Sequence, residues 1–309
     1  MSRVHDALRK AAQTTSAPVQ ERIRTSPDID AALTGATVVT EEPLTIQEAL
    51  ERAEEVNYDP SVDGLLIDPS RPQEAPTEEF RSLRTRLNHM QTLQPIRTVV
   101  ITSASPAEGK SFAAMNLALT QAQLAGKRVL IADFDFRRPI VHNLMQVDRS
   151  PGITDYLLGK APLEKIVKRV AGTNLYVMPA GEAVMNPLEL LNLQDVRTLL
   201  DQLPSFFDWV ILDTPPLLFA ADANLLSTMC HGTILVVRIG TTTIDAITRA
   251  MQSLCENKVL GIVVNGARRG ELYSKYTYYH SYYTPREERL TDGEAEPAPE
   301  TSPSPPAKE

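Results

Sequence analysis

The chain has few cysteines, no histidine pair with metal-ligand spacing and no long apolar run. Its two cysteines, Cys230 and Cys255, have neither metal-site nor redox spacing, so we expect a reducing compartment. None of the five histidines forms an HExxH-like pair. No apolar segment approaches the ~18 residues needed to span a membrane, and residues 1–10 lack the apolar core of a signal peptide. Together these absences predict a cytosolic protein.

The chain also lacks an excess of positive charge, because 31 lysines and arginines stand against 39 acidic residues, for a formal net charge of −8. A chain this acidic offers no dominant basic surface, so we do not expect nucleic acid as a partner. The length is sufficient for one α/β domain of about 200 residues with additional tails.

A phosphate-binding loop is the most informative feature that is present. It reads Ile101-Thr-Ser-Ala-Ser-Pro-Ala-Glu-Gly-Lys-Ser-Phe112, between a strand-like segment at 98–101 and a helix-like segment at 113–125. Backbone N–H groups in such a loop, together with the following helix dipole, bind phosphate oxygens. Lys110 can reach the β- and γ-phosphates, and the Ser111 hydroxyl can bind Mg²⁺. The strict pattern has glycine where this chain has Ala104, so a surface turn with a solvated lysine is the alternative for the loop alone.

Two further apolar strands end in acidic residues. Arg128-Val-Leu-Ile-Ala is followed by Asp133 and Asp135, and Asp208-Trp-Val-Ile-Leu is followed by Asp213. Ligands of open α/β sheets bind beyond the carboxyl ends of the strands, so these acids are expected near the loop. Carboxylates near a triphosphate require a cation, which implies Mg²⁺. The alternative for each acid is a helix cap at the end of a strand.

The order of predicted elements defines an α/β fold with a mainly parallel sheet covered on both faces. The expected strands are 97–103, 128–134, 174–179, 208–214, 233–239 and 260–265, and the expected helices are 77–90, 109–125, 188–203 and 243–256. Residues 1–12 read as an amphipathic helix, docked on the core or on a partner. Residues 13–76 read as a linker with a helix at 45–56 that begins with a capping box. The domain proper is expected at 77–272, and the acidic, proline-rich tail 284–309 is expected to be disordered.

A cluster of tyrosines lies between the domain and the tail, at 273–283. The segment contains six of the nine tyrosines, and it could form an aromatic edge strand, a partner-binding patch or a set of phosphate acceptors. The candidate acceptors are Tyr273, Tyr276, Tyr278, Tyr279, Tyr282 and Tyr283.

With these motifs the chain resembles the bacterial tyrosine kinases (BY-kinases) of capsule and exopolysaccharide synthesis, of the CpsD/CapB type. The resemblance covers about 77–283. Asp133-Phe-Asp-Phe-Arg-Arg-Pro is similar to the family's second aspartate motif, and Asp213-Thr-Pro-Pro is similar to its Walker B motif. Glu78-Glu-Phe-Arg81-Ser-Leu-Arg84 is similar to its oligomerisation motif, and the family's loop also lacks the first glycine.

The resemblance implies a three-layer α/β/α P-loop NTPase fold of the SIMIBI type, shared with ParA and MinD. It also implies an ATP-dependent protein-tyrosine autokinase that phosphorylates its C-terminal cluster in trans. Lys110, Asp133, Asp135 and Asp213 are then the catalytic candidates, and Ser111, Asp133 and Asp213 are the candidate metal ligands. The nucleotide-binding candidates are Ser105, Pro106, Ala107, Glu108, Gly109, Lys110, Ser111, Phe112 and Asn265.

Roles within this site are assigned as follows. Lys110 and the loop amides hold the transferring group, Asp213 acts through a metal-bound water, and Asp133 accepts or orients the tyrosine proton with Asp135 assisting. Arg137 could bind phosphate or form a structural ion pair, whereas Arg138 is expected to be structural. Asn265 could read the adenine edge or cap a loop.

Glu78, Arg81 and Arg84 lie close to one helix face. They could form a solvated intrahelical pair, but the resemblance favours contacts between subunits of a homo-oligomeric ring. It also implies a separate transmembrane activator that recruits the kinase to the inner face of the membrane. A neighbour in the ring is the expected target of transfer, because the cluster begins directly after the last predicted strand.

The chain departs from the family at Ala107, where the loop usually has glycine. If that position requires a positive φ, alanine costs on the order of 1 kcal/mol. A regulatory pseudokinase subunit that binds nucleotide without transfer therefore stays an alternative. A ParA/MinD-like ATPase switch is a second alternative, although the signature lysine of that class is Ser105 here.

Overall fold

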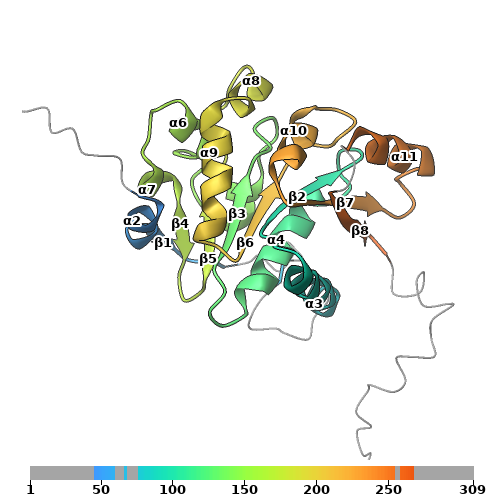
Figure 1. The fold of residues 1–309 in the computed structure, drawn as a ribbon, viewed down its shortest axis with the longest axis horizontal. Helices are drawn as coiled ribbons and strands as arrows, with labels where there is room; N and C mark the ends of the chain where they lie inside the picture. Colours follow the sequence, from blue (N-terminus) through green and yellow to red (C-terminus); the bar gives the residue numbers. More distant parts are fainter. Residues whose placement is uncertain (1–44, 60–65, 68–75, 255–257, 268–309) are drawn as a thin grey trace, which may run out of the picture. The chain divides into compact units, whose positions relative to one another are not determined.

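The computed structural model describes residues 45–59, 66–67, 76–254 and 258–267. The predictions for the amphipathic helix, for most of the linker, for the tyrosine cluster and for the tail lie outside these residues. The described part of the chain forms an α/β domain around one sheet (Figure 1).

The sheet has eight described strands in the order β1-β4-β5-β3-β6-β2-β7-β8. All neighbouring strands are parallel except β4 and β5. The strands are β1 (Glu54–Val56), β2 (Thr98–Ser103), β3 (Val129–Asp133), β4 (Lys168–Val170), β5 (Leu175–Met178), β6 (Trp209–Asp213), β7 (Gly232–Arg238) and β8 (Val259–Asn265). The predicted fold class, a mainly parallel sheet in a P-loop NTPase arrangement, is confirmed.

Helices cover both faces of this sheet, as the continuous apolar runs of the central strands require. Alternate residues of β2 belong to different clusters: Val99 and Ile101 pack with α3 and α4, whereas Val100 packs on the opposite face with α9. The described helices are α2 (Ile46–Glu51), α3 (Thr77–Leu93), α4 (Lys110–Ala122), α5 (Val141–Met145), α6 (Ile153–Leu157), α7 (Leu163–Ile166), α8 (Pro187–Leu191), α9 (Gln194–Gln202), α10 (Asp222–Met229) and α11 (Ile244–Ser253). A short 3₁₀ turn, Leu203–Ser205, follows α9.

The helix that we predicted at 45–56 is wrong beyond Arg52. The capping box is present, because Thr45 and Glu48 exchange hydrogen bonds, but α2 ends at Glu51 and residues 54–56 form β1. Pairing of β1 with β4, together with the ion pair between Lys168 Nζ and Glu54 Oε2 at 2.8 Å, overrides local helix propensity. The described part of the predicted linker therefore contributes a strand to the domain.

The helix predicted at 188–203 is divided into α8 and α9. The side chain of Asn192 donates a hydrogen bond to the Leu188 carbonyl at 3.0 Å, and Leu193 has an extended backbone with φ −60° and ψ 145°. Asparagine side chains that bond to nearby backbone groups compete with helix continuation. The sequence pattern alone did not reveal this break.

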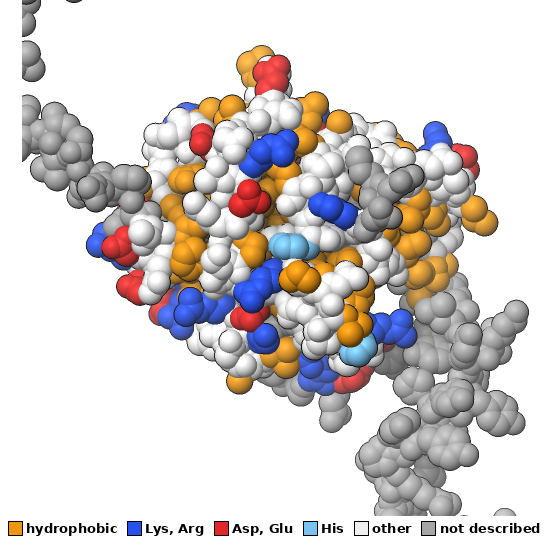
Figure 2. All heavy atoms as spheres, viewed as in Figure 1, with side chains coloured by type: hydrophobic (Ala, Val, Ile, Leu, Met, Phe, Trp, Pro, Cys, Tyr) orange, Lys and Arg blue, Asp and Glu red, His pale blue; other side chains and the backbone are white. Residues whose placement is uncertain are grey.

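The order of strands places three functional segments side by side. β2, β6 and β3 are consecutive in the sheet, and all three run parallel. Their carboxyl ends, which carry the P-loop, Asp213 and Asp133, therefore meet at one edge. On the face shown in Figure 2, acidic and basic side chains are interspersed, and hydrophobic side chains gather on the side of α11 and β8.

Candidate active site

The P-loop connects β2 to α4 and contains two residues with left-handed backbone conformation. Gly109 has φ 95°, and a Cβ atom there would lie 1.9 Å from Asn265 Nδ2, so both conformation and space require glycine. Lys110 follows as the first residue of α4. The loop therefore directs the N-terminus of a thirteen-residue helix, with its unsatisfied N–H groups, toward the carboxyl edge of the sheet.

Ala107 is the second left-handed residue, with φ 63°. This is the conformation in which alanine was expected to be strained, at a cost on the order of 1 kcal/mol. Contacts elsewhere in the domain must offset that strain for the loop to keep its shape.

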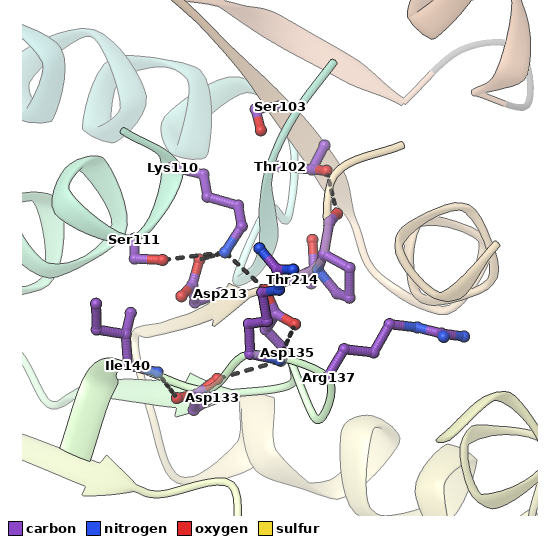
Figure 3. Close-up of polar contacts among 12 residues, drawn as sticks. Thr102, Ser103, Lys110, Ser111, Asp133, Asp135, Arg137, Ile140, Asp213 and Thr214 are labelled. Carbon is purple, nitrogen blue, oxygen red and sulfur yellow. Dashed lines mark hydrogen bonds and ion pairs between the residues drawn. The ribbon is translucent and has the colours of Figure 1, made fainter. Parts of the chain in front are cut away.

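Lys110 is the centre of a buried cluster of charges (Figure 3). Its Nζ atom lies 2.8 Å from Asp135 Oδ2 and 3.5 Å from Asp213 Oδ1, and it donates to Ser111 Oγ at 3.1 Å. Burial alone would lower the pKa of Lys110, but Asp213 and Asp135 outweigh burial and raise it. The lysine is therefore a fixed cation between the loop and the acidic strand ends.

Asp213 ends β6 and has no exposed surface. Its carboxylate oxygens accept no hydrogen bond from the described residues, and the Lys110 ammonium lies 3.5 Å from Oδ1. Burial raises the pKa of Asp213, and the nearby Lys110 opposes that rise. Because Asp213 shares this one lysine with Asp135, a second cation at Asp213 would further offset the cost of burying its carboxylate.

These features fit Mg²⁺ held by the Asp213 carboxylate and the Ser111 hydroxyl. Magnesium sites in nucleotide-binding proteins use one or two protein oxygens, with water and substrate phosphates as the other ligands. Within the described residues, no three acidic, histidine or cysteine side chains gather into a metal site, so phosphate oxygens would have to complete the coordination.

Asp133 is held differently from Asp213. Its Oδ1 accepts the N–H of Asp135 at 3.1 Å, and its Oδ2 accepts those of Ile140 and Val141 at 3.0 Å. Burial, followed by the charge of Asp213, raises the pKa of Asp133 to about 8, although the Val141 N–H acts in the opposite direction. The carboxylate therefore anchors the loop between β3 and α5. Because both of its oxygens already accept backbone N–H groups, Asp133 is a poorer metal ligand than Asp213.

The two arginines after Asp135 have structural contacts. Arg137 donates from Nε and from a terminal nitrogen to the two oxygens of Asp222, at 2.8 and 3.1 Å, and Arg138 N–H donates to Asp135 Oδ1 at 3.0 Å. Arg137 is therefore an ion-pair residue, whereas the Arg138 contact is made by its backbone, so the structural role expected of the Arg138 side chain stays a prediction. Asp222, the first residue of α10, was missed because 85 residues separate it from its partner.

The remaining predicted nucleotide-binding residues have three kinds of surroundings. Ser105 N–H donates to Glu108 Oε2 at 2.9 Å, and Asn265 Nδ2 donates to the Glu108 carbonyl at 3.0 Å, so both contacts stabilise the loop. Pro106 is exposed on the loop surface. Phe112 packs edge-on against Phe80 of α3, with ring centroids 6.0 Å apart, so its contact is with the core.

The oligomerisation motif lies on α3. Arg81 forms an ion pair with Glu78 one turn earlier on the same helix. Arg84 donates to the Thr120 carbonyl of α4 at 2.9 Å, and therefore holds α3 against α4 within one chain. The tyrosine cluster lies outside the described residues.

The fold and this edge of the sheet define a P-loop nucleotide-binding protein. A family model described as an AAA domain matches residues 96–256. The chain is 36% identical over 216 residues to the tyrosine-protein kinase YwqD of Bacillus subtilis (strain 168), covering 69% of this chain and 90% of that protein. It is 34% identical over 218 residues to the tyrosine-protein kinase etk of Escherichia coli (strain K12), of which it spans 29%.

Solved structures agree with these relatives. The kinase domain of Escherichia coli tyrosine kinase ETK superposes with a TM-score of 0.63 at 29% identity, covering 74% of this chain and 96% of that structure. The chimerical protein CapA2B2 superposes with a TM-score of 0.62 at 27% identity, covering 71% and 96%. The chain belongs to the family of bacterial tyrosine kinases, and it is a protein-tyrosine kinase.

Proposed function

We propose that this kinase transfers the γ-phosphoryl group of ATP to the tyrosine cluster of a neighbouring copy, and thereby regulates the synthesis and export of an exopolysaccharide or capsule polysaccharide. The observation that carries the proposal is the buried Lys110, placed at the start of α4 and facing Asp135 and Asp213. The acceptors in this proposal are Tyr273, Tyr276, Tyr278, Tyr279, Tyr282 and Tyr283.

The chain's own groups supply binding and charge stabilisation. The loop amides and Lys110 bind the phosphates, and Ser111 and Asp213 hold Mg²⁺, which would neutralise charge on the β- and γ-phosphates. Lys110 then exchanges its contact with Asp135 for phosphate oxygens. Because phosphoryl transfer has a loose transition state, positioning and charge contribute more than activation of the nucleophile.

Asp133 is the proposed acceptor or orienter of the tyrosine proton, with Asp135 assisting. A carboxyl with a pKa of about 8 is closer to a phenol near 10 than an ordinary aspartate near 4. Its Oδ1 accepts one N–H and keeps a lone pair for a second donor.

Asp133→Asn should keep the affinity for ATP within about tenfold, or ~1.4 kcal/mol, and should remove phosphotransfer. The asparagine NH₂ group would stand where a carboxylate oxygen now accepts backbone N–H groups. We therefore expect the free energy of unfolding to fall by about 1–3 kcal/mol. Calorimetry, denaturation and tyrosine phosphorylation, measured on one preparation, separate these effects.

Asp155→Asn is the matched control. Asp155, in α6, is another buried carboxylate, and it accepts the N–H groups of Gly152 and Glu182 at 2.8 and 3.3 Å. It should lose stability while keeping transfer. Equal activity of the two variants at matched folded fraction would show that Asp133 only anchors its loop.

A second candidate, a regulatory subunit that binds nucleotide without transfer, rests on the strained Ala107 with φ 63°. The discriminating experiment is incubation with Mg-ATP and the cytosolic segment of the activator, followed by mapping of phosphorylated tyrosines. Bound ATP with no labelled tyrosine would favour this candidate.

We further propose a homo-oligomeric ring and a separate transmembrane activator, the polysaccharide co-polymerase or chain-length determinant, which recruits the kinase to the inner face of the membrane. In the described part of the chain, no helix is both long and apolar enough to cross a membrane. Each phosphotyrosine adds about −1.5 to −2 charge, which would repel the acid-lined site and loosen the ring.

Self-association should depend on Arg81. Arg81→Ala together with Arg84→Ala should shift sedimentation toward monomer, but Arg84 also holds α3 to α4, so Arg81→Ala alone is the sharper test. Arg86→Ala, at an exposed position on the same helix, should leave the assembly unchanged. An intact oligomer in Arg81→Ala would reduce the motif to an intrahelical ion pair.

A further inference from the structure

A buried carboxylate inside the P-loop has its partner in a distant turn. Glu108 is 1% exposed, and its Oε2 accepts the Ser105 N–H from the same loop. Its Oε1 accepts the hydroxyl of Thr242 at 2.5 Å. Thr242 lies between β7 and α11, 134 residues further along the chain.

The orientation of the Thr242 hydroxyl is fixed. The backbone N–H of Arg238 donates to the same oxygen at 2.8 Å, so the oxygen accepts one hydrogen bond there. A hydroxyl has a single proton, and in Thr242 this proton is directed at Glu108. The pair is therefore a charge-assisted hydrogen bond, which is stronger than one between neutral groups.

Two neighbouring carbonyl groups of the loop are held from the same side. Arg238 donates from its guanidinium to the Ala107 carbonyl at 3.3 Å, and Asn265 Nδ2 donates to the Glu108 carbonyl at 3.0 Å. In a trans peptide the C=O of one residue and the N–H of the next point in opposite directions. The N–H groups of Glu108 and Gly109 are consequently directed away from the Arg238 and Asn265 side chains.

We propose that Thr242 is a positioning residue for nucleotide binding, because it fixes Glu108 and thereby the two peptide planes that present N–H groups to the phosphates. This inference rests on the proposed function of the loop as the ATP site. The left-handed conformation of Ala107 is unfavourable by about 1–2 kcal/mol. The hydrogen bonds to Glu108 and to the Ala107 carbonyl explain how this cost is offset.

The test replaces Thr242 by valine, which keeps the shape of the side chain and removes the hydroxyl. The dissociation constant of Mg-ATP, measured by calorimetry well below the melting temperature, should rise about tenfold (~1.4 kcal/mol). Thr242→Ser keeps the hydroxyl and should restore binding. The KM for ATP should rise with the dissociation constant, while kcat at saturating ATP should stay close to that of the parent.

Thr248→Val is the matched control, since the Thr248 hydroxyl donates to the Ile244 carbonyl within α11 and does not touch the loop. A second variant, Glu108→Gln, removes the carboxylate that accepts the Thr242 hydroxyl. The double variant Thr242→Val with Glu108→Gln should bind Mg-ATP no more weakly than the weaker of the two single variants. Parent-like affinity in Thr242→Val, or additive losses in the double variant, would overturn the inference. Failure of the parent to bind Mg-ATP would instead overturn the proposed function.

Discussion

Replacement of Lys110 by methionine is expected to abolish measurable binding of Mg-ATP in calorimetry. In the proposed site this lysine binds the β- and γ-phosphates, and its present partners are Asp135 and Asp213. Truncating one partner of a buried, hydrogen-bonded charge pair can weaken binding by about 5 kcal/mol, or more than about a thousandfold. Phosphotransfer should disappear with binding.

The same substitution should destabilise the protein without nucleotide. Without Lys110, the carboxylates of Asp135 and Asp213 are left buried with no opposing cation, and loss of one partner of a buried ion pair typically costs about 3–5 kcal/mol. Loss of ATP binding must therefore be separated from loss of folded protein.

The double variant Lys110→Met with Asp135→Asn provides that separation. It removes one of the two unpaired charges, so its melting temperature should recover part of the loss, while ATP binding should stay absent. Recovery of binding together with stability would show that Lys110 only neutralises the acids, and the P-loop assignment would then fail.

The residues at the strand ends were predictable because each follows a continuous apolar run. Val129 to Ala132 and Trp209 to Leu212 read as buried parallel strands, and the first polar residue after each is Asp133 or Asp213. Since parallel strands share one carboxyl edge, the convergence of these acids on Lys110 follows from local patterns and from the topology they imply.

What each acid does at that edge was not predictable, because it depends on contacts made by the following loop. Asp133 accepts N–H groups from Ile140 and Val141, seven and eight residues later, whereas Asp213 accepts no hydrogen bond and lies 3.5 Å from the Lys110 ammonium. Both residues have the same type and the same place on a strand. Only the path of the chain after each strand distinguishes a carboxylate that anchors a loop from one whose oxygens accept no hydrogen bond.

Partners that are far apart in sequence were missed for a related reason. Thr242 stands in an ordinary run of three threonines, and Asp222 is an ordinary helix start, so neither has a sequence signal. Each acquires its role from a partner more than eighty residues away, Glu108 and Arg137 respectively. Periodicity and motif spacing describe neighbours along the chain, and they contain no information on such pairs.

Phosphorylation of the tyrosine cluster is expected to occur in trans. The length of the chain does not distinguish transfer to a neighbouring subunit (in trans) from transfer within one subunit (in cis). The eight residues from Asn265 to Tyr273 extend to about 27 Å, more than the ~19 Å that four strand spacings place between β8 and β3. A neighbour in a ring would present its cluster to the site without crossing β7 and the P-loop of its own subunit. The route must therefore be tested by mixing chains.

The experiment mixes a Lys110→Met chain, whose tyrosines are intact, with an active chain that lacks residues 273–309. Label from ATP should appear on the Lys110→Met chain within the segment 273–283, because only the truncated chain can transfer and only the other can accept. The Lys110→Met, Asp135→Asn chain should be labelled equally, which controls for poor folding of the acceptor. If no label appears even with the activator segment present, an active wild type would establish transfer in cis, whereas a silent wild type would show that the chain binds nucleotide without acting on its own tyrosines.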